Sequence, residues 1–295
     1  INMLQASIPV EVSFTAVAAD QLKAIVNSRP FQGRLLKEWF GGLEQTDRAR
    51  IQQALQLGMA QGETIDDIVR RVVGTRANDY ADGILSITRR DATTVIRTAV
   101  NHVSNAARAE VWNANSDIIA AKVWVATLDG RTTLLCASRD GKGAPIAGKP
   151  LPEGMQPLEP EGATPPAHMN CRSVMVAVID GVGLIGDRPT VADTRTREQR
   201  EVDFAALARE SGKSIKQIRA EWAARVVGRT PSVTSYEEFL RRQSLKFQEE
   251  VLGVTKAKLF RTGKLRLDQF VDKSGNELTL DEMSQTAPEA FRLIA

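Results

Sequence analysis

Cysteine and histidine are scarce in this chain of 295 residues, which has two of each, and aromatic residues make up 5% of it. Two cysteines in a chain of this length cannot build a disulfide scaffold, so we expect folding in a reducing cytoplasm. No run of about 18 uncharged apolar residues occurs, so we expect no membrane-spanning helix. A net charge of +3 is too small to indicate nucleic-acid binding by itself.

The short motifs of common enzyme sites are missing as well. The sequence has no G-x-x-x-x-G-K-[ST] phosphate loop, no H-E-x-x-H and no G-x-S-x-G, and no G-x-G-x-x-G opens a helical pattern. Hydrophobic residues make up 42% and charged residues 25%, a balance typical of soluble globular proteins. These features predict a protein that is not an enzyme.

Residues 15–116 show the periodicity of helices. The longest pattern runs from Thr88 to Asn115 and predicts a helical arm of about 40 Å at about 1.5 Å per residue. Thr64 with Asp67 predicts a capped helix start. Shorter helical patterns lie at 18–28, 33–43, 46–62 and 64–74.

The period changes after residue 116. Residues 121–129 and 173–179 alternate or concentrate β-branched residues and predict two strands. Between them, residues 129–172 hold most of the prolines and many glycines, which predicts a long irregular loop that carries function or needs a local tether.

The C-terminal part again reads as helical. Residues 181–203 have the turn residues and mixed charges of a linker, and helices are expected at 214–228, 235–253 and after Thr279. We therefore predict an α+β fold in four parts. These are a helical N-terminal region with a long arm (1–116), a small β-containing module with a cross-tied loop (117–180), a linker (181–203) and a helical C-terminal region (204–295).

Cys136, His168 and Cys171 form the most specific cluster in the sequence. His-x-x-Cys brings two zinc-type ligands together in one turn, Cys136 adds a third, and Asp129 or Asp140 offers a fourth. Zinc is one interpretation. The alternatives are small buried thiols with a locally hydrogen-bonded histidine, a Cys136–Cys171 disulfide, or a Cys–His nucleophile. His102, within the long helical pattern, is expected to be a packing or surface residue.

Two further groups of basic residues stand out. Arg131 and Arg172 flank the loop, and we expect them to pair with Asp129 or Asp140 rather than to bind an external carboxylate or phosphate. Between residues 241 and 266, eight Lys or Arg stand against two Glu. Contact with DNA phosphates or an acidic protein is one interpretation and a solvated helix face is the other. These residues are Arg241, Arg242, Lys246, Lys256, Lys258, Arg261, Lys264 and Arg266.

The segments "KVWVATLDGRTTLLCASRDGK" and "PPAHMNCRSVMVAV" resemble the phage Mu F-like head morphogenesis family of minor capsid proteins. The upstream helix and the tail from residue 235 are also similar to that family. Where the family has Cys-Arg-Cys, this chain has Cys171-Arg172-Ser173, which removes one potential ligand. The residues that carry the resemblance are Trp124, Asp129, Arg131, Thr132, Cys136, Asp140, Gly141, Pro166, His168, Asn170, Cys171 and Arg172.

The resemblance implies a minor head protein of a tailed bacteriophage. Such a protein is assembled in the host cytoplasm, lies inside the capsid near the portal, and contributes to DNA packaging or ejection. The expected partners are the portal protein, scaffold or major capsid protein, and packaged DNA bound without sequence preference. Two alternatives stay open: a toxin-like enzyme acting on nucleic acid or a nucleotide, and an ejected DNA-binding protein.

Overall fold

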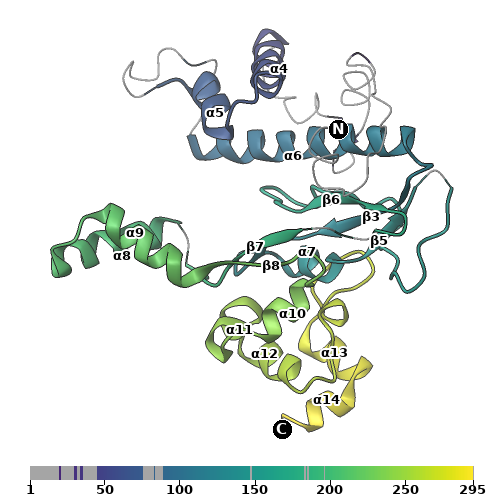
Figure 1. Ribbon diagram of the computed structural model, residues 1–295. Helices are drawn as coiled ribbons and strands as arrows, with labels where there is room; N and C mark the ends of the chain where they lie inside the picture. The colour runs from purple at the N-terminus through teal and green to yellow at the C-terminus, as the bar shows by residue number, and fades with distance from the viewer. Residues whose placement is uncertain are drawn as a thin grey trace.

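The computed structural model describes residues 20, 30–31, 34–35, 45–75, 83, 89–146, 148–182, 184, 186–195 and 197–294. Within these residues the fold is α+β, as predicted, with small sheets between two helical regions (Figure 1). The elements run in the order β1 (Pro30–Phe31), β2 (Arg34–Leu35), α4 (Gln45–Ala60), α5 (Ile65–Val73), α6 (Arg89–Ala114), β3 (Ile119–Val125), β4 (Leu128–Asp129), α7 (Leu134–Arg139), β5 (Gly143–Pro145), β6 (Val174–Ile179), β7 (Asp187–Val191), α8 (Arg197–Ser211), α9 (Ile215–Val226), β8 (Val227–Pro231), α10 (Tyr236–Arg241), α11 (Leu245–Leu252), α12 (Val254–Arg261), a 3₁₀ turn (Leu267–Phe270), α13 (Leu280–Thr286) and α14 (Pro288–Arg292).

Helices α4, α5 and α6 pack together around their own apolar core. Thr64 caps α5 with the capping box that Asp67 completes, and Gly74 ends the helix, as the sequence predicted. The buried contacts between these helices come from one apolar stripe on each, which is the expected way for amphipathic helices to bury surface. The buried residues of this core are Ile51, Ala54, Leu55, Ile68, Val69, Val72, Val73, Ile96 and Ala99.

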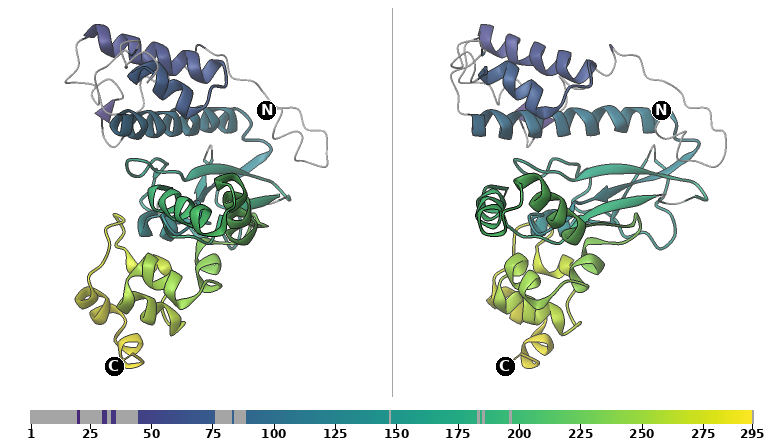
Figure 2. Two further views of the ribbon diagram at one scale, coloured as in Figure 1. Left: turned by 90° about the vertical axis from the view of Figure 1, so that its left-hand side faces the viewer. Right: turned by 60° about the vertical axis from the view of Figure 1, so that its left-hand side comes forward.

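Helix α6 lies across the three-stranded sheet β5-β3-β6 (Figures 1 and 2). Strand β3 is the central strand and pairs antiparallel with both neighbours, with Val123 opposite Val176 on one side and Gly143 on the other. Trp124 on β3 is completely buried between the sheet and the loops beside it. The sheet and α6 together form the support for residues 129–172.

The predicted irregular loop at 129–172 contains two regular elements. Helix α7 begins after Thr133, whose side chain accepts a hydrogen bond from the Cys136 N–H. Strand β5 then pairs with β3. The prediction was wrong at α7 and β5, because it was based on the proline and glycine content, whereas a threonine cap and pairing with β3 determine the structure of these two elements.

The predicted linker at 181–203 is part of the folded structure. Strand β7 pairs parallel with β4 and antiparallel with β8, so this segment closes a second three-stranded sheet. Helices α8 and α9 then form a hairpin that projects to one side (Figure 1). At its base the Trp222 indole N–H donates to Asp193 at 2.6 Å, and Phe204 packs edge-on against Trp222. Mixed charge made this segment look like a linker, but several of its charges pair with one another.

The C-terminal helices form the largest apolar cluster of the described residues. The helix predicted at 235–253 is two helices, because Ser244 caps the start of α11 instead of continuing α10. The capping boxes of Ser235 with Glu238 and of Thr279 with Glu282 are present as predicted. Buried residues of this cluster include Leu128, Tyr236, Phe239, Leu240, Leu259, Phe260, Leu267, Phe270 and Met283.

Two expectations concern the N-terminal part. The helix predicted at 33–43 is wrong at Arg34–Leu35, which pairs with Pro30–Phe31 as a short antiparallel ladder. Pro30, which lacks a backbone N–H, disfavours a helix here. Of the helix predicted at 18–28, Asp20 is helical and the rest lies outside the described residues. Among the described helices, none has the length and apolar character needed to cross a membrane.

Candidate functional site

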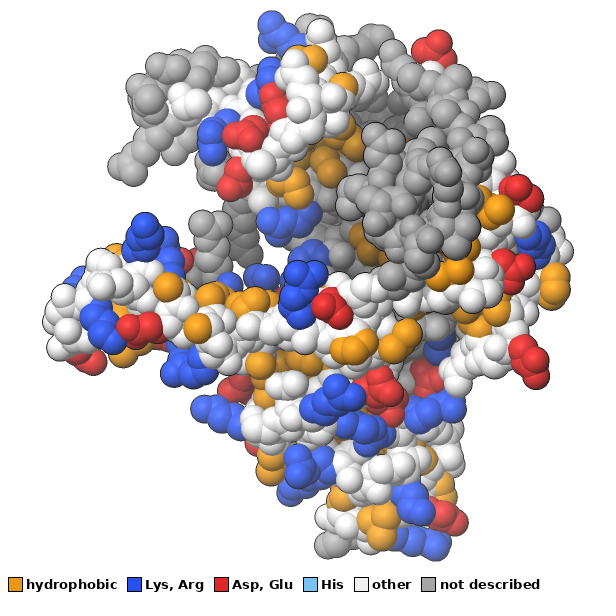
Figure 3. Space-filling view, in the orientation of Figure 1, with side chains coloured by type: hydrophobic (Ala, Val, Ile, Leu, Met, Phe, Trp, Pro, Cys, Tyr) orange, Lys and Arg blue, Asp and Glu red, His pale blue; other side chains and the backbone are white. Residues whose placement is uncertain are grey.

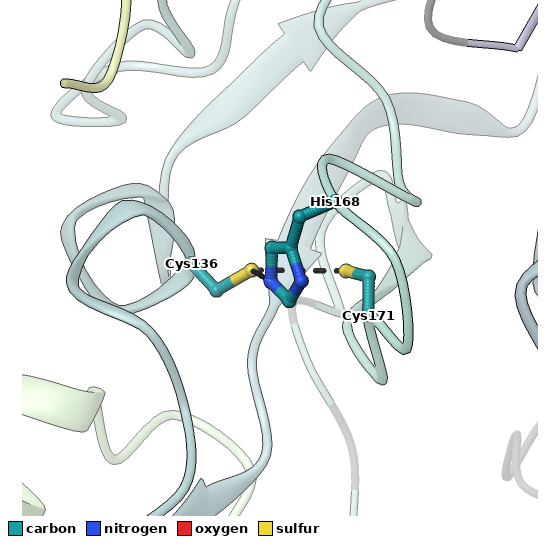
Figure 4. Close-up of side chains that lie close together, drawn as sticks. All are labelled: Cys136, His168 and Cys171. Carbon is teal, nitrogen blue, oxygen red and sulfur yellow. Dashed lines mark hydrogen bonds between the residues drawn. The ribbon is translucent and has the colours of Figure 1, made fainter. Parts of the chain in front are cut away.

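The structure brings Cys136, His168 and Cys171 together from two separate segments. Cys136 lies in the first turn of α7, and His168 and Cys171 lie in the turn that leads into β6. A backbone hydrogen bond of 3.1 Å from the Cys171 N–H to the His168 carbonyl closes that turn. The close-up in Figure 4 shows the imidazole of His168 beside the two sulfur atoms.

The three side chains are in direct contact. The Cys136 sulfur is 3.1 Å from His168 Nε2 and 3.7 Å from the Cys171 sulfur. Both cysteines are free and buried, so no disulfide joins them. His168 Nδ1 lies 2.9 Å from the Met169 carbonyl oxygen, and its Nε2 is also 3.1 Å from the Thr133 hydroxyl.

The surroundings of the cluster shift the pKa values of the two thiols in opposite directions. The hydrogen bond between the sulfurs lowers the pKa of Cys171 and raises that of Cys136, with burial adding to the rise at Cys136. The hydrogen bond with Cys171 raises the pKa of His168. The two shifts are opposite because the hydrogen bond between the thiols favours the charged form of one sulfur and disfavours that of the other.

A polar stripe on α6 holds the loop that carries the cluster. The Thr98 hydroxyl accepts the Asn170 N–H at 2.9 Å, and Asn101 donates to the carbonyls of Cys171 and Ser173 at 2.7 and 3.1 Å. Asn105 accepts the Met175 N–H at 2.8 Å. Sequence reasoning missed these residues. The available signal was the spacing of Thr94, Thr98, Asn101 and Asn105, which places four uncharged polar side chains on one face of the helix.

Asp129 and Arg172 form the predicted internal ion pair. Both terminal nitrogens of the Arg172 guanidinium donate to the buried Asp129 carboxylate, Nη2 at 2.8 Å. Thr132 and the Arg131 N–H also donate to it. Burial alone would raise the pKa of Asp129, but the hydrogen bonds and charge of Arg172 outweigh it and hold that pKa below its usual value. The Arg131 side chain stays largely exposed at 45%.

Asp140 joins three parts of the chain. Its side chain is 1% exposed and accepts hydrogen bonds from the N–H groups of Ala126 and Tyr236, each at 2.6 Å. The guanidinium of Arg188 on β7 contributes two more, at 3.0 and 3.1 Å. Arg188 was not identified from the sequence, because the expected partners of Asp140 were Arg131 and Arg172.

The other residues that carry the resemblance contribute to the backbone conformation and packing around the cluster. Gly141 has a φ of +80° and donates its N–H to the Trp124 carbonyl at 2.8 Å, and the left-handed conformation favours glycine there. Asn170 also has a positive φ of 60°. Pro166 follows a cis peptide bond. The Arg139 guanidinium lies over the Trp124 ring at 5.4 Å. His102 is buried on α6, in line with a packing role.

The space beside the cluster is small. A cavity of about 20 Å³ is lined by Cys136, His168, Arg172, Ser173 and neighbouring residues, which leaves room for about one water molecule. Among the described residues, the cluster is the one group of His, Cys, Asp or Glu with metal-ligand spacing, its three ligand atoms lying within 4.8 Å of one another. Neither Asp129 nor Asp140, the carboxylates considered as a fourth ligand, belongs to it.

The eight basic residues at 241–266 divide into two groups. Four bind inside the C-terminal region: Arg241 contacts Glu237 and two carbonyls, Lys256 contacts Glu277, Arg261 contacts Gln248, and Arg266 contacts Asp268. The other four, Arg242, Lys246, Lys258 and Lys264, are exposed, and Arg241, Arg261 and Arg266 are exposed as well despite these contacts. On the face seen in Figure 3, the C-terminal region shows mainly basic side chains with some acidic ones among them.

These contacts define an α+β module in which a helix and two loops are held together at several buried points. Residues 49–176 match the model of the family described as Phage Mu protein F like protein, a region that runs from α4 into β6 and contains the whole cluster. The resemblance stated from the sequence is thereby confirmed over this region. The family suggests a phage head morphogenesis protein and so a virion location. No curated protein and no solved structure matches the chain.

Proposed function

We propose that the chain is a minor head protein that associates with the portal inside the capsid during procapsid assembly. The observation that carries the proposal is the family match over residues 49–176, because it covers both the arm α6 and the tied loops. Scaffold and major capsid protein are the further partners we propose, since both surround the portal while the head is built. A contribution to DNA packaging or ejection follows from the same location.

The architecture supports a mechanical role. Helix α6 has 26 residues, so it extends about 39 Å at about 1.5 Å per residue. The loop that follows is fixed to it by Thr98, Asn101 and Asn105. Rigid elements present a partner surface without the ordering cost that mobile segments incur on binding.

Several features argue against catalysis. The cavity beside Cys136 and His168, at about 20 Å³, has no room for a nucleotide. The guanidinium of Arg172 is paired with Asp129. Residues 181–186 have G-x-G-x-x-G spacing, but strand β7 follows them where a dinucleotide loop requires a helix. We therefore propose a structural protein and not an enzyme.

Binding to a protein partner is also better supported than tight DNA binding. Half of the basic residues considered for phosphate contact are engaged inside the C-terminal region. If the four residues outside these contacts each neutralised one phosphate, the association constant would fall with a slope of about −4 in its logarithm against log salt. DNA contact is then a secondary, sequence-independent interaction.

The test is co-expression of the tagged chain with the portal protein of the same phage. We expect the chain to sediment with portal rings on a gradient and to stay bound after nuclease treatment. The portal of an unrelated phage is the matched control and is expected to sediment without the chain. Sedimentation of the chain as free monomer in both cases contradicts portal association.

A further inference from the structure

We propose that Cys136, His168 and Cys171 bind one zinc ion, with the fourth ligand an oxygen held at Ser173. Tetrahedral zinc with Zn–S bonds of about 2.3 Å places two sulfur ligands about 3.8 Å apart. The two sulfurs here are 3.7 Å apart. A nitrogen ligand lies about 3.6 Å from each sulfur in such a site, and His168 Nε2 is 3.1 Å from the Cys136 sulfur.

The imidazole of His168 is oriented as a ligand. Its Nδ1 lies 2.9 Å from the Met169 carbonyl oxygen, which can only accept a hydrogen bond, so Nδ1 carries the proton. Nε2 is then left with a lone pair directed at the sulfurs. A ring nitrogen bonded to a backbone carbonyl while the other binds metal is the usual arrangement of zinc-binding histidines.

The backbone on both sides of the ligands is already fixed. Thr133 caps α7 and receives the Cys136 N–H, which sets the direction of that side chain. Asn101 donates to the carbonyl of Cys171 at 2.7 Å. The ligands therefore sit on supported elements, so binding the ion costs little rearrangement.

The fourth position points to Ser173. Ser173 is 2% exposed and lies two residues after the ligand Cys171. It lines the cavity of about 20 Å³ together with Cys136 and His168. That volume accommodates one water molecule, so either the hydroxyl or a water bound to it completes the coordination.

The charges of such a site balance. Zinc binding displaces the thiol protons to solvent and leaves two thiolates, whose charges cancel that of the divalent ion. A neutral, soft-ligand site suits buried surroundings, and thiolates with imidazole favour zinc over magnesium or calcium. The site is independent of the proposed function, because portal binding does not enter the argument.

The first experiment uses the unaltered protein. Purified from zinc-supplemented cells under reducing conditions, it is expected to contain about one zinc per chain by elemental analysis. Replacement by Co²⁺ is expected to give a thiolate-to-cobalt absorption band and the intense visible bands of a four-coordinate site. A metal-free protein that gives no such bands overturns the proposal. A mass two hydrogens below the reduced value, which marks a Cys136–Cys171 disulfide, also overturns it.

The second experiment tests the fourth position. Ser173→Cys is expected to raise zinc affinity by about tenfold or more, since a thiolate replaces an oxygen ligand. Ser138→Cys is the matched control, because Ser138 lies on the same helix as Cys136 but donates to the Leu135 carbonyl, away from the cluster. It is expected to leave the affinity unchanged. Equal affinity in Ser173→Cys and the parent contradicts the assignment of this position.

His168→Asn is the complementary loss variant. It keeps a side chain that can hydrogen-bond but removes the ring nitrogen, and we expect zinc affinity to fall by about 100-fold or more. Circular dichroism of the variant confirms that it is folded before affinity is compared. A folded variant with the parent's affinity overturns the proposal. Portal sedimentation of the metal-free parent separates the two hypotheses, since retained binding would leave the proposed function standing without the zinc site.

Discussion

Replacing Asp140 with alanine is the most informative perturbation of the fold. Asp140 is the one residue described above whose carboxylate contacts the Mu F-like module, strand β7 and the start of α10 together. It accepts the N–H groups of Ala126 and Tyr236 and two donors from Arg188. Alanine removes all four interactions at a position where the carboxylate side chain is 1% exposed.

The expected loss of stability follows from what remains behind. The Arg188 side chain is 10% exposed, so its charge stays buried and loses its carboxylate partner. Breaking a buried ion pair from one side costs about 3–5 kcal/mol. The N–H groups of Ala126 and Tyr236 lose their acceptor, which adds about 1–3 kcal/mol each. These costs overlap in part with that of the broken ion pair. We therefore expect the free energy of unfolding to fall by about 4 kcal/mol or more.

Urea unfolding followed by circular dichroism measures this change. Glu221→Ala is the matched control, because it removes a carboxylate from an exposed ion pair with Lys213, and it is expected to change stability by less than about 1 kcal/mol. The double variant Asp140→Ala with Arg188→Met also removes the unpaired buried guanidinium, so we expect it to recover part of the lost free energy of unfolding. A loss below about 1 kcal/mol for Asp140→Ala, or no recovery in the double variant, refutes the reasoning.

Three further predictions concern the loops and the hairpin. Asn170→Ala is expected to lose about 1–2 kcal/mol in urea unfolding, because alanine disfavours a φ of 60° and removes a side-chain hydrogen bond, whereas Asn170→Gly loses less. The lowered pKa of Asp129 stabilises the fold above about pH 4, and this contribution is lost as the pH falls through the folded-state pKa, so the stability gap between parent and Asp129→Asn should close at low pH. Burial acts to raise the pKa of Asp193, but hydrogen bonds from Arg195 and Trp222 outweigh it and lower this pKa to about 2. Asp193 then contributes about 2 kcal/mol that is lost between about pH 4 and pH 2, seen as a smaller Asp193→Asn effect in acid than at pH 7.

Local signals in the sequence predicted much of the fold. Capping residues such as Thr64, Ser235 and Thr279 determine the starts of helices through contacts within four residues. The strands at β3 and β6 follow from alternation and β-branched composition. Such features are readable because both partners of each interaction lie close together in the chain.

Pairing between segments far apart in the chain could not be predicted from the sequence. Strand β7 is short and polar and contains Pro189, and only its pairing with β4 and β8 makes it a strand. Ser244 has the same local pattern whether it continues a helix or caps the next one. The choice depends on packing of α10 and α11 into the C-terminal core, for which the local sequence gives no signal.

Part of the candidate site was likewise predicted from local sequence, and part depends on contacts between distant segments. The convergence of Cys136, His168 and Cys171 was expected from residue type and the short His-x-x-Cys spacing. The support from Thr98, Asn101 and Asn105 was missed, because polar residues on a helix usually face water. The Arg188 partner of Asp140 was missed since 48 residues separate the two in the chain. Residue chemistry predicts what a site contains, but topology decides which side chains hold it in place.

The central claim is that the chain is incorporated into the phage head through the portal. Its most direct test is the amount of the chain in purified procapsids made with and without the portal protein. We expect a small, constant number of copies in portal-containing procapsids and a loss of the chain from procapsids that lack the portal. Equal amounts in both kinds of particle, or absence from both, would contradict it.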